Sequence, residues 1–553
     1  MEILRVENLN FSYPETETAA LSDVSFSINA GDFTVLCGRS GCGKTTLLRL
    51  LKKELSPVGN MRGEIYFRGR NLTEIDAKTS AAKIGFVMQN PESQTVTDKV
   101  WHELAFGLEN SGLPTGEIRR RVAETASYFG ISDWFRKRTD ELSGGQKQIL
   151  ALASVMVMRP DILLLDEPTS QLDPIAAEDF ISTLRKLNRE LGITVITAEH
   201  RLEEIFPVAD KVIVMDGGKL GAFDIPERIG TLLPEDHPIK KALPSATRIA
   251  LSLGKKGDLP LTVRDGKTYL EENFGKAEKP PEIKEYTHSD EKAIELKNVW
   301  FRYEKDLPDI LRGLTFSVYK GEIFSVLGGN GVGKTTALNV ISGLAKAYRG
   351  KTLISGKKVG DYKNNSLYRR KLAFLPQDPQ TVFVKDTLKA DFEELLKALD
   401  VPKDKREEKI LSAVEKTGTE EFLTRHPFDL SGGEMQKAAL TKMLLTEPEI
   451  LLLDEPTKGL DAFSKENLKN LIFSLRDGGL TVLEVTHDIE FAAEISDRCA
   501  LFFDGETVSE DVPEIFFAGN DFYTTAANRI ARNLYENAVT CEQVVKFCRG
   551  NEK

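Results

Sequence analysis

One set of short motifs occurs twice along the chain, in the same order. A glycine-rich loop, GRSGCGKTT, covers residues 38–46, and a second loop, GGNGVGKTT, covers residues 328–336. The two loop lysines, Lys44 and Lys334, stand 290 positions apart. A repeat at this distance indicates a duplicated domain rather than a short repeating unit. The chain therefore has to fold into two similar bodies.

The spacing of the motifs that follow each loop supports the duplication. Each loop is followed by a glutamine, an LSGGQ or LSGGE segment (the signature), an ILLLDEP segment and a histidine. The glutamine precedes the signature serine by 54 positions in both copies, and that serine precedes the aspartate by 23. We therefore expect a duplicated domain of roughly 230 residues. The residues concerned are Gln89, Ser143, Asp166 and His200 in the first copy, and Gln377, Ser431, Asp454 and His487 in the second.

A weaker repeat follows each copy. The segment SATRIALSL at 245–253 is similar to AANRIARNL at 526–534, which predicts a small C-terminal appendage on each domain. Between the copies, a charged stretch with Pro-Pro and no apolar period predicts a linker. The predicted order is a first domain at 1–233, its appendage at 234–271, the linker at 272–292, a second domain at 293–516 and its appendage at 517–553.

The coarse pattern within each copy is α/β. FTVLCG and EIFSVLGG are short apolar runs that lead into the glycine loops, and KTTLLRLLKK after the first loop is typical of a helix. DILLLDEP and EILLLDEP are continuous apolar runs of the kind that buried parallel strands use. Each copy is therefore predicted to hold a parallel sheet with a strand–loop–helix phosphate site.

The glycine loops fit the GxxxxGK[ST] pattern of phosphate-binding loops. Their glycines let backbone N–H groups turn towards phosphate oxygens, and the positive end of the following helix attracts the same anion. Lys44 and Lys334 would reach the β- and γ-phosphates, and Thr45 and Thr335 would hold Mg²⁺. A plain glycine turn is the alternative, and the companion motifs exclude it. The predicted ATP-binding loop residues are Gly38, Arg39, Ser40, Gly41, Cys42, Gly43, Lys44, Thr45 and Thr46, and Gly328, Gly329, Asn330, Gly331, Val332, Gly333, Lys334, Thr335 and Thr336.

Paired acids end the ILLLDEP strands. Asp166 and Asp454 stand where a Mg²⁺-coordinating carboxylate is expected, and Glu167 and Glu455 follow them. We assign these glutamates to polarising the attacking water. The histidines that follow the next apolar run, His200 and His487, would bind the γ-phosphate and orient the attack, and we call them the switch histidines.

The signature places a serine and two glycines at the start of a helix, which predicts a second phosphate-binding end. Because the loop already holds the phosphates, this end must serve the other face of a nucleotide. Two copies can then pack head to tail with two ATP molecules between them, as a pseudo-dimer within one chain. The predicted signature contacts to ATP are Ser143, Gly144, Gly145 and Gln146, and Ser431, Gly432, Gly433 and Glu434.

Composition narrows the class of protein. The net charge is −11, which disfavours general nucleic-acid binding. The start, MEILRVENLN, lacks the apolar core of a signal peptide, and no apolar run reaches the roughly 20 residues of a membrane helix. Five cysteines without a CxxC pair suggest no disulfide framework. A reduced, cytosolic protein is expected.

The motif set resembles that of the ABC ATPases, over almost the whole chain. The resemblance implies two tandem P-loop ABC ATPase domains, each with a helical signature subdomain, that use ATP and Mg²⁺ as a clamp. It implies that Tyr13 and Tyr303, each 31 positions before its loop lysine, stack on adenine, although a core or edge aromatic residue is the alternative. It also implies Mg²⁺ contacts from Gln89 and Gln377. Asp173 and Asp461 match the D-loop, which communicates across the dimer.

Departures from the family pattern are mild. The second signature ends in Glu434 rather than glutamine, and Glu199 precedes the first switch histidine. The D-loops read SQLD and KGLD. None of these changes removes a catalytic group, so we expect two competent sites that can differ in rate.

The segment NPESQTVTDKVWHELAFGLEN is similar to the energy-coupling factor ATPases, in which it lines the groove for the membrane subunit. This resemblance implies a transmembrane coupling subunit and a small membrane substrate-capture subunit as partners, a vitamin or trace metal as cargo, and a peripheral position on the cytoplasmic face of the membrane. An ordinary surface helix is the alternative. In that case Trp101, Leu104, Phe106 and Leu108 would pack inward.

Two other assignments stay open. A sugar-type ABC importer can also fuse two ATPase copies, but its second copy is often degenerate, and here the second copy is complete. A soluble ABC factor acting on ribosomes or DNA would be expected to carry a long basic linker or zinc-binding cysteine clusters, and neither is present in the sequence. The energy-coupling importer is the favoured interpretation.

Overall fold

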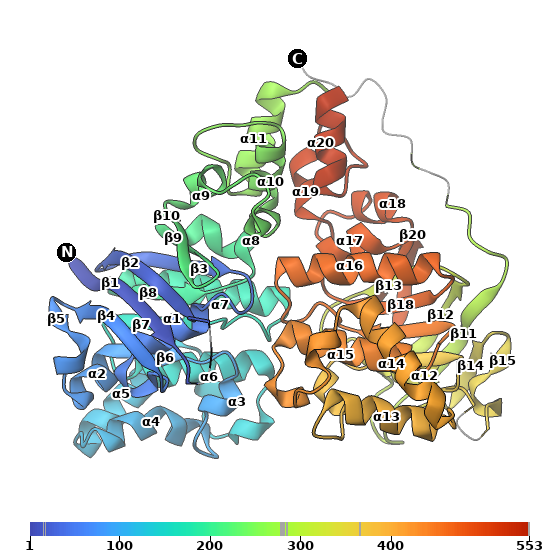
Figure 1. Ribbon diagram of the computed structural model, residues 1–553, viewed down its shortest axis with the longest axis horizontal. Helices are drawn as coiled ribbons and strands as arrows, with labels where there is room; N and C mark the ends of the chain where they lie inside the picture. The colour runs from blue at the N-terminus through green and yellow to red at the C-terminus, as the bar shows by residue number, and fades with distance from the viewer. Residues whose placement is uncertain (15, 17, 277–282, 284–285, 364–365, 551–553) are drawn as a thin grey trace. The chain divides into compact units, whose positions relative to one another are not determined.

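The computed structural model describes residues 1–550 except 15, 17, 277–282, 284–285 and 364–365. The chain forms two compact units, Met1–Thr262 and Val263–Lys553, each with its own sheets and hydrophobic clusters (Figure 1). Part of the predicted linker, 277–282 and 284–285, and the last three residues of the second predicted appendage lie outside the described residues.

The first unit contains two sheets. One is antiparallel with the strand order β2-β1-β4-β5, and the other has the order β10-β9-β3-β8-β7-β6. All neighbours in the second sheet are parallel except the β9–β10 pair. The strands are β1 (Glu2–Ser12), β2 (Leu21–Asn29), β3 (Phe33–Gly38), β4 (Asn60–Phe67), β5 (Arg70–Asn71), β6 (Ile84–Val87), β7 (Ile162–Asp166), β8 (Thr194–Ala198), β9 (Lys211–Asp216) and β10 (Lys219–Asp224).

Helices of the first unit follow clear local signals. The longest, α7, starts with Asp173 as its N-cap and Pro174 in the first turn, and it ends at Gly192, whose φ of 67° only glycine adopts freely. Its buried residues recur every three or four positions and face the sheet. The helices are α1 (Lys44–Leu50), α2 (Ala77–Lys83), α3 (Pro91–Gln94), α4 (Val100–Asn110), α5 (Thr115–Tyr128), α6 (Gly144–Met156), α7 (Pro174–Leu191), α8 (Leu202–Ile205), α9 (Pro226–Leu232) and α10 (Ser245–Ser252).

The second unit repeats both sheets, with the orders β12-β11-β14-β15 and β16-β17-β18-β13-β19-β20. The predicted tandem α/β fold is confirmed. Its strands are β11 (Lys292–Phe301), β12 (Leu311–Tyr319), β13 (Ile323–Leu327), β14 (Arg349–Ile354), β15 (Lys357–Lys358), β16 (Leu372–Leu375), β17 (Ile450–Asp454), β18 (Thr481–Thr486), β19 (Arg498–Phe503) and β20 (Glu506–Asp511). Its helices are α11 (Val263–Asn273), α12 (Lys334–Ser342), α13 (Leu388–Ala398), α14 (Lys403–Thr417), α15 (Gly432–Leu444), α16 (Ala462–Asp477), α17 (Ile489–Ile495), α18 (Pro513–Ala518), α19 (Ala526–Ala531) and α20 (Cys541–Gly550).

The central strands place the site. Every residue of β7 and β17, both ILLLD, is buried, as expected for strands covered on both faces. In the first unit β3, β7 and β8 run parallel, so their carboxyl ends meet at one edge of the sheet. The glycine loop, the paired acids and the switch histidine follow those three ends and therefore share that edge.

Helices α4, α5 and α6 form a separate cluster around the signature of the first unit. On α4, Leu104 and Leu108 are fully buried in this cluster, whereas Trp101 is 43 % exposed and stacks on His102. Phe106 is half-buried. The helix therefore packs inward through its leucines and leaves Trp101 at the surface.

The two appendages share a local design. Thr247 on α10 donates a hydrogen bond to Pro260 O at 2.6 Å, and Thr525, the N-cap of α19, donates one to Val539 O at 2.7 Å. Helix α11 belongs to the second unit, where it packs against α19 (Figure 1). Tyr535, which is fully buried, donates a hydrogen bond from its hydroxyl to Gly275 O at 3.0 Å.

Candidate functional site

The glycine loops adopt backbone conformations that side chains would obstruct. Gly41 and Gly43 have φ angles of 79° and 101°, and the equivalent residues of the second loop, Gly331 and Gly333, have angles of 77° and 108°. A Cβ atom on Gly43 would lie 2.7 Å from Ala20 O. The pattern of glycines therefore follows from the turn itself, which leads directly into α1 and α12.

The loop lysines are held inside their loops. Lys44 Nζ donates hydrogen bonds to Gly38 O at 3.0 Å and Arg39 O at 3.2 Å, and Lys334 Nζ donates to Gly328 O at 2.8 Å and Gly329 O at 3.0 Å. Both lysine side chains are buried. A buried ammonium group at the mouth of a glycine loop is placed to meet an anion.

Each loop threonine contacts the strand-end aspartate. Thr45 Oγ1 donates to Asp166 Oδ1 at 3.0 Å, and Thr335 Oγ1 donates to Asp454 Oδ1 at 3.2 Å. Burial, together with the neighbouring glutamate charge, raises the pKa of each aspartate to about 6. A hydroxyl and a carboxylate are hard oxygen donors, which is the donor set that Mg²⁺ prefers. The residues present therefore fit Mg²⁺.

The glutamates after the aspartates sit in a strained conformation. Glu167 has a φ of 47° and Glu455 a φ of 50°, in the left-handed region that residues with a Cβ rarely occupy. Their N–H groups donate to Ala198 O and Val485 O on the neighbouring strands. Strain of this kind is concentrated at functional sites. It turns each glutamate away from the strand direction, towards the switch histidine.

Both switch histidines lie against these glutamates. His200 Nε2 is 2.7 Å from Glu167 Oε1, and His487 Nδ1 is 2.8 Å from Glu455 Oε2. Burial alone would raise the pKa of Glu455, but the hydrogen bond and charge of His487 and the charge of Lys334 lower it overall. The equivalent lysine in the first unit, Lys44, lies 3.7 Å from Glu167. Each glutamate therefore sits between a lysine and a histidine, where an ionised carboxylate is favoured.

The glutamines differ between the copies. Gln89 Nε2 donates to Glu167 Oε2 at 2.8 Å, so the amide nitrogen of this glutamine contacts the predicted catalytic residue. Among the described residues, Gln377 makes no hydrogen bond to Glu455. The two sites therefore differ in this contact, although both contain the same motifs.

Tyr13 and Tyr303 lie beside the helices that follow the loops. The Tyr13 hydroxyl is 3.0 Å from Thr46 Oγ1, and the Tyr303 hydroxyl is 3.3 Å from Thr336 Oγ1. Tyr303 is 59 % exposed. Tyr303 is therefore at the surface beside its loop, whereas Tyr13 is half-buried and packs against a hydrophobic cluster of the first unit.

The signature serines cap their helices. Ser143 Oγ accepts from Gln146 N, while the Gln146 side chain accepts from Ser143 N at 3.0 Å. In the second copy Glu434 takes the place of the glutamine and accepts from Ser431 N at 2.8 Å. Both side chains supply the acceptor that a capping box needs. The departure at Glu434 therefore leaves the local structure of the signature unchanged.

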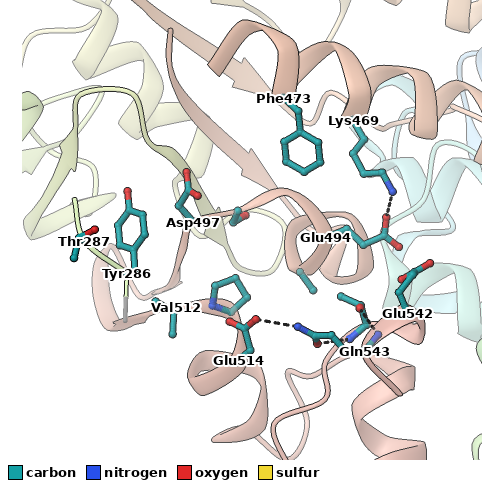
Figure 2. A pocket seen from close by; sticks show the side chains of 14 residues that line it. Tyr286, Thr287, Lys469, Phe473, Glu494, Asp497, Val512, Glu514, Glu542 and Gln543 are labelled. Atoms are coloured by element: carbon teal, nitrogen blue, oxygen red, sulfur yellow. Dashed lines mark hydrogen bonds and ion pairs between the residues drawn. The ribbon is translucent and has the colours of Figure 1, made fainter. Parts of the chain in front are cut away.

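A cavity of about 570 Å³ lies elsewhere in the second unit (Figure 2). Tyr286 and Phe473 contribute aromatic rings, and carboxylates and one lysine contribute charge. None of the candidate ATP-binding residues lines it. Two polar contacts lie in its wall. Lys469 and Glu494 form an ion pair at 2.9 Å, and Gln543 donates a hydrogen bond to Glu514.

Some residues at the site were not assigned a role from the sequence. In the sequence Glu199 stands out only as a departure from the family pattern, yet its buried carboxylate contacts Thr169. Arg201 contacts Leu172. A contact of this kind joins segments about 30 positions apart, and no local spacing indicates it.

The described residues contain no helix with the length and apolar character of a membrane span.

Comparisons with known proteins agree with this geometry. The family description "ABC transporter" matches residues 21–170 and 311–458. The chain is 42 % identical to an ABC transporter ATP-binding protein of Bacillus thuringiensis subsp. konkukian, over 98 % of each chain. It is 34 % identical to one of Methanosarcina acetivorans, over 91 % of this chain and 86 % of the relative. It is 30 % identical to a Bacillus subtilis protein named as the HMP/thiamine import ATP-binding protein YkoD, over 98 % of this chain and 97 % of the relative.

Both matched ranges contain a complete set of loop and strand-end residues, and the relatives align along nearly the whole chain. The chain therefore belongs to the ABC transporter family, as an ATP-binding and ATP-hydrolysing protein with two tandem ABC domains.

Proposed function

We propose that this chain is the ATPase subunit that energises a membrane importer of the energy-coupling factor type. The observation that carries the proposal is that both halves hold a complete set of loop lysine, threonine–aspartate pair, and glutamate–histidine pair. Two complete sites argue against the sugar-type importer ATPase, in which the second copy is often degenerate. The similarity to a relative named for HMP/thiamine import adds support for a vitamin as cargo, with a trace metal as the other candidate class.

In the proposed mechanism the loop binds the phosphates of ATP. The backbone N–H groups of the loop donate to phosphate oxygens, and Lys44 exchanges its carbonyl partners for the β- and γ-phosphates. Tyr13, beside Thr46, provides a ring for the adenine to stack on. Lys334 and Tyr303 take the same roles in the second half.

Glu167 and Glu455 polarise the attacking water in this mechanism. A base that is ionised at neutral pH is needed, and the nearby lysine and histidine stabilise the ionised form of each glutamate. The switch histidine donates a hydrogen bond to the γ-phosphate and holds the glutamate in place. The strained backbone of the glutamate keeps its side chain at this position rather than along the strand.

Thr45 and Asp166, and Thr335 and Asp454, would hold Mg²⁺, with Gln89 and Gln377 as further oxygen donors. Mg²⁺, when bound, supplies positive charge that offsets the charge on the β- and γ-phosphate oxygens. The signature of each half would bind the ATP held by the loop of the other half, so that two ATP molecules lie in the pseudo-dimer. The covalent link between the halves raises their effective concentration for each other.

The proposed partners are a transmembrane coupling subunit and a small substrate-capture subunit, with this chain at the cytoplasmic face. Exposed Trp101 on α4 is available for contact with the coupling subunit. The test is a pull-down of the tagged full-length chain from its own cells in mild detergent, with mass spectrometry of the partners. Two multi-span membrane proteins, one of them a substrate-capture subunit, are expected.

Other outcomes of the pull-down would reject the proposal. A membrane-protein pair with an extracellular sugar-binding protein would favour the sugar-type importer. Ribosomal proteins without a membrane partner would favour a factor that acts away from the membrane. Neither outcome would test the two proposed ATP sites, because ATP hydrolysis is measured in a separate experiment.

A further inference from the structure

Three consecutive residues after β8 contact the segment that follows the predicted catalytic glutamate. His200 in the centre contacts Glu167. Glu199 before it contacts Thr169, and Arg201 after it contacts Leu172. The switch loop of the first unit is therefore joined at three points to the stretch that leads from Glu167 into the D-loop.

Glu199 makes two hydrogen bonds to the same residue of the 169–172 segment. Its side chain is 2 % exposed, and its two oxygens accept separate hydrogen bonds, from Thr169 N at 3.2 Å and Thr169 Oγ1 at 2.9 Å. The backbone N–H of Glu199 in turn donates to Leu36 O on β3, which fixes the residue to the sheet.

Arg201 extends the attachment towards the D-loop. Its Nη2 atom donates to Leu172 O at 2.8 Å. Leu172 directly precedes Asp173, whose side chain accepts from Ala176 N at 2.8 Å and so starts α7. Any displacement of the switch loop is therefore transmitted by hydrogen bonds to both ends of the 169–172 segment.

Among the described residues of the second unit, neither flanking contact has a counterpart. At the position of Glu199 stands Thr486, whose hydroxyl accepts from Asp488 N at 3.0 Å. Asp488 takes the position of Arg201, and it caps α17 and pairs with Lys465 on α16 at 2.5 Å. The second switch loop is thus attached to α16 and α17, while its histidine still contacts Glu455.

We propose that Glu199 and Arg201 are positioning residues of the first ATP site, which make its switch histidine and D-loop move as one body, and that the second site has no such coupling. The two sites then differ in how the switch histidine is joined to the D-loop, although their catalytic residues match. The proposal rests on the roles proposed above for Glu167 and His200. It assigns the difference between the sites to residues that touch neither ATP nor water.

The test uses the full-length chain with three substitutions. Glu199→Thr introduces the residue found in the second copy, Glu199→Gln keeps a side chain that can bond to Thr169, and Thr486→Val is the matched control in the second unit. Amide exchange is followed in the peptides that cover 166–173 and 454–461, and kcat and KM for ATP are measured. Amide exchange reports on the attachment without depending on catalysis.

In Glu199→Thr we expect faster exchange at 166–173 and a rate at the first site lowered about tenfold, because misplacement lowers the rate more than it lowers binding. Since the second site still turns over, the kcat of the chain should fall to roughly half, and the KM should change by less than about twofold. Glu199→Gln should restore most of the kcat, and Thr486→Val should change neither peptide nor rate. Unchanged exchange at 166–173 in Glu199→Thr would overturn the proposal. So would an unchanged kcat, or equal losses in Glu199→Thr and Glu199→Gln.

A further variant separates this proposal from the proposed function. Glu167→Gln tests the catalytic role directly. If Glu167→Gln hydrolyses ATP at the normal rate, the assignment of Glu167 fails whatever Glu199 does. If Glu167→Gln is slow but Glu199→Thr is normal, only the positioning proposal fails.

Discussion

Glu203 joins the switch region to the first appendage: its Oε2 atom accepts hydrogen bonds from Ser245 N at 2.7 Å and Ser245 Oγ at 3.0 Å. Glu203 lies on α8, three positions after the switch histidine His200, and Ser245 starts α10. The second unit has the same link, because Glu490 accepts from Ala526 N at 2.7 Å. A single carboxylate in each half therefore holds the first turn of the appendage helix.

Removing this carboxylate should loosen the appendage. In Glu203→Ala we expect the amides of 245–252 to exchange about tenfold faster or more, because a hydrogen bond to a charged group contributes about 1.5–3 kcal/mol. Ser245→Ala should have a smaller effect, since it loses the hydroxyl but keeps the backbone donor. Amide exchange with mass spectrometry measures both. Equal exchange of α10 in the native chain and in Glu203→Ala would contradict the link.

The catalytic assignment predicts a separation of binding from hydrolysis. Glu167→Gln or Glu455→Gln removes a general base, which is expected to lower hydrolysis at that site by about 10²–10⁴-fold while ATP still binds. Steady-state hydrolysis and equilibrium ATP binding check the two parts. Normal turnover in either variant would take that glutamate out of the catalytic set.

Buried Glu484 predicts a pH-dependent stability. Burial, with the charges of Asp488 and Glu455, raises its pKa well above the usual value, and among the described residues neither carboxylate oxygen has a hydrogen-bond partner. The folded form therefore binds the proton more tightly than the unfolded chain does. Its contribution to stability is complete below the unfolded pKa of about 4.3 and is lost as the pH rises through the raised folded pKa.

Glu484→Gln should remove this dependence. The amide has nearly the same shape as the carboxyl group but does not titrate. The Tm of the variant should therefore fall less than that of the native chain as the pH rises from about 5 to about 8. Thermal unfolding at several pH values measures the slope. Parallel Tm profiles would show that Glu484 takes up no proton on folding.

The contact of α11 with the second unit predicts a graded effect at Tyr535. Tyr535→Phe loses one hydrogen bond to Gly275 and should cost about 1 kcal/mol. Tyr535→Ala also leaves a cavity and should cost about 3–5 kcal/mol, by analogy with other aromatic residues in cores. Amide exchange of 263–273 is the measurement. If Tyr535→Ala leaves that exchange unchanged, α11 is held by other contacts.

The sequence predicted what depends on local pattern. The glycine turns at Gly41 and Gly43, the buried strand before Asp166 and the helix start at Ser143 each follow from residues a few positions apart. Because the motifs are duplicated, one copy also served as a check on the other. This is why the α/β fold with two tandem domains could be predicted.

Contacts between distant segments were not predictable in this way. The left-handed backbone of Glu167 follows from the strand that its N–H meets, and the bond between Glu199 and Thr169 follows from the packing of β8 beside β7. Neither depends on spacing along the chain. Burial of Glu484 likewise depends on β18 being covered on both faces, and the sequence there, TVLEVTH, does not show it.

The place of α11 has a consequence for synthesis on the ribosome. Residues 263–273 are made before α19, the helix they pack against at 526–531. At about 5–20 residues per second, the roughly 250 intervening residues take on the order of 10–50 s to make. For that time the buried face of α11, with Leu270, does not have α19 to pack against. The segment directly after the first unit therefore emerges early and waits for α19 before its packing is complete.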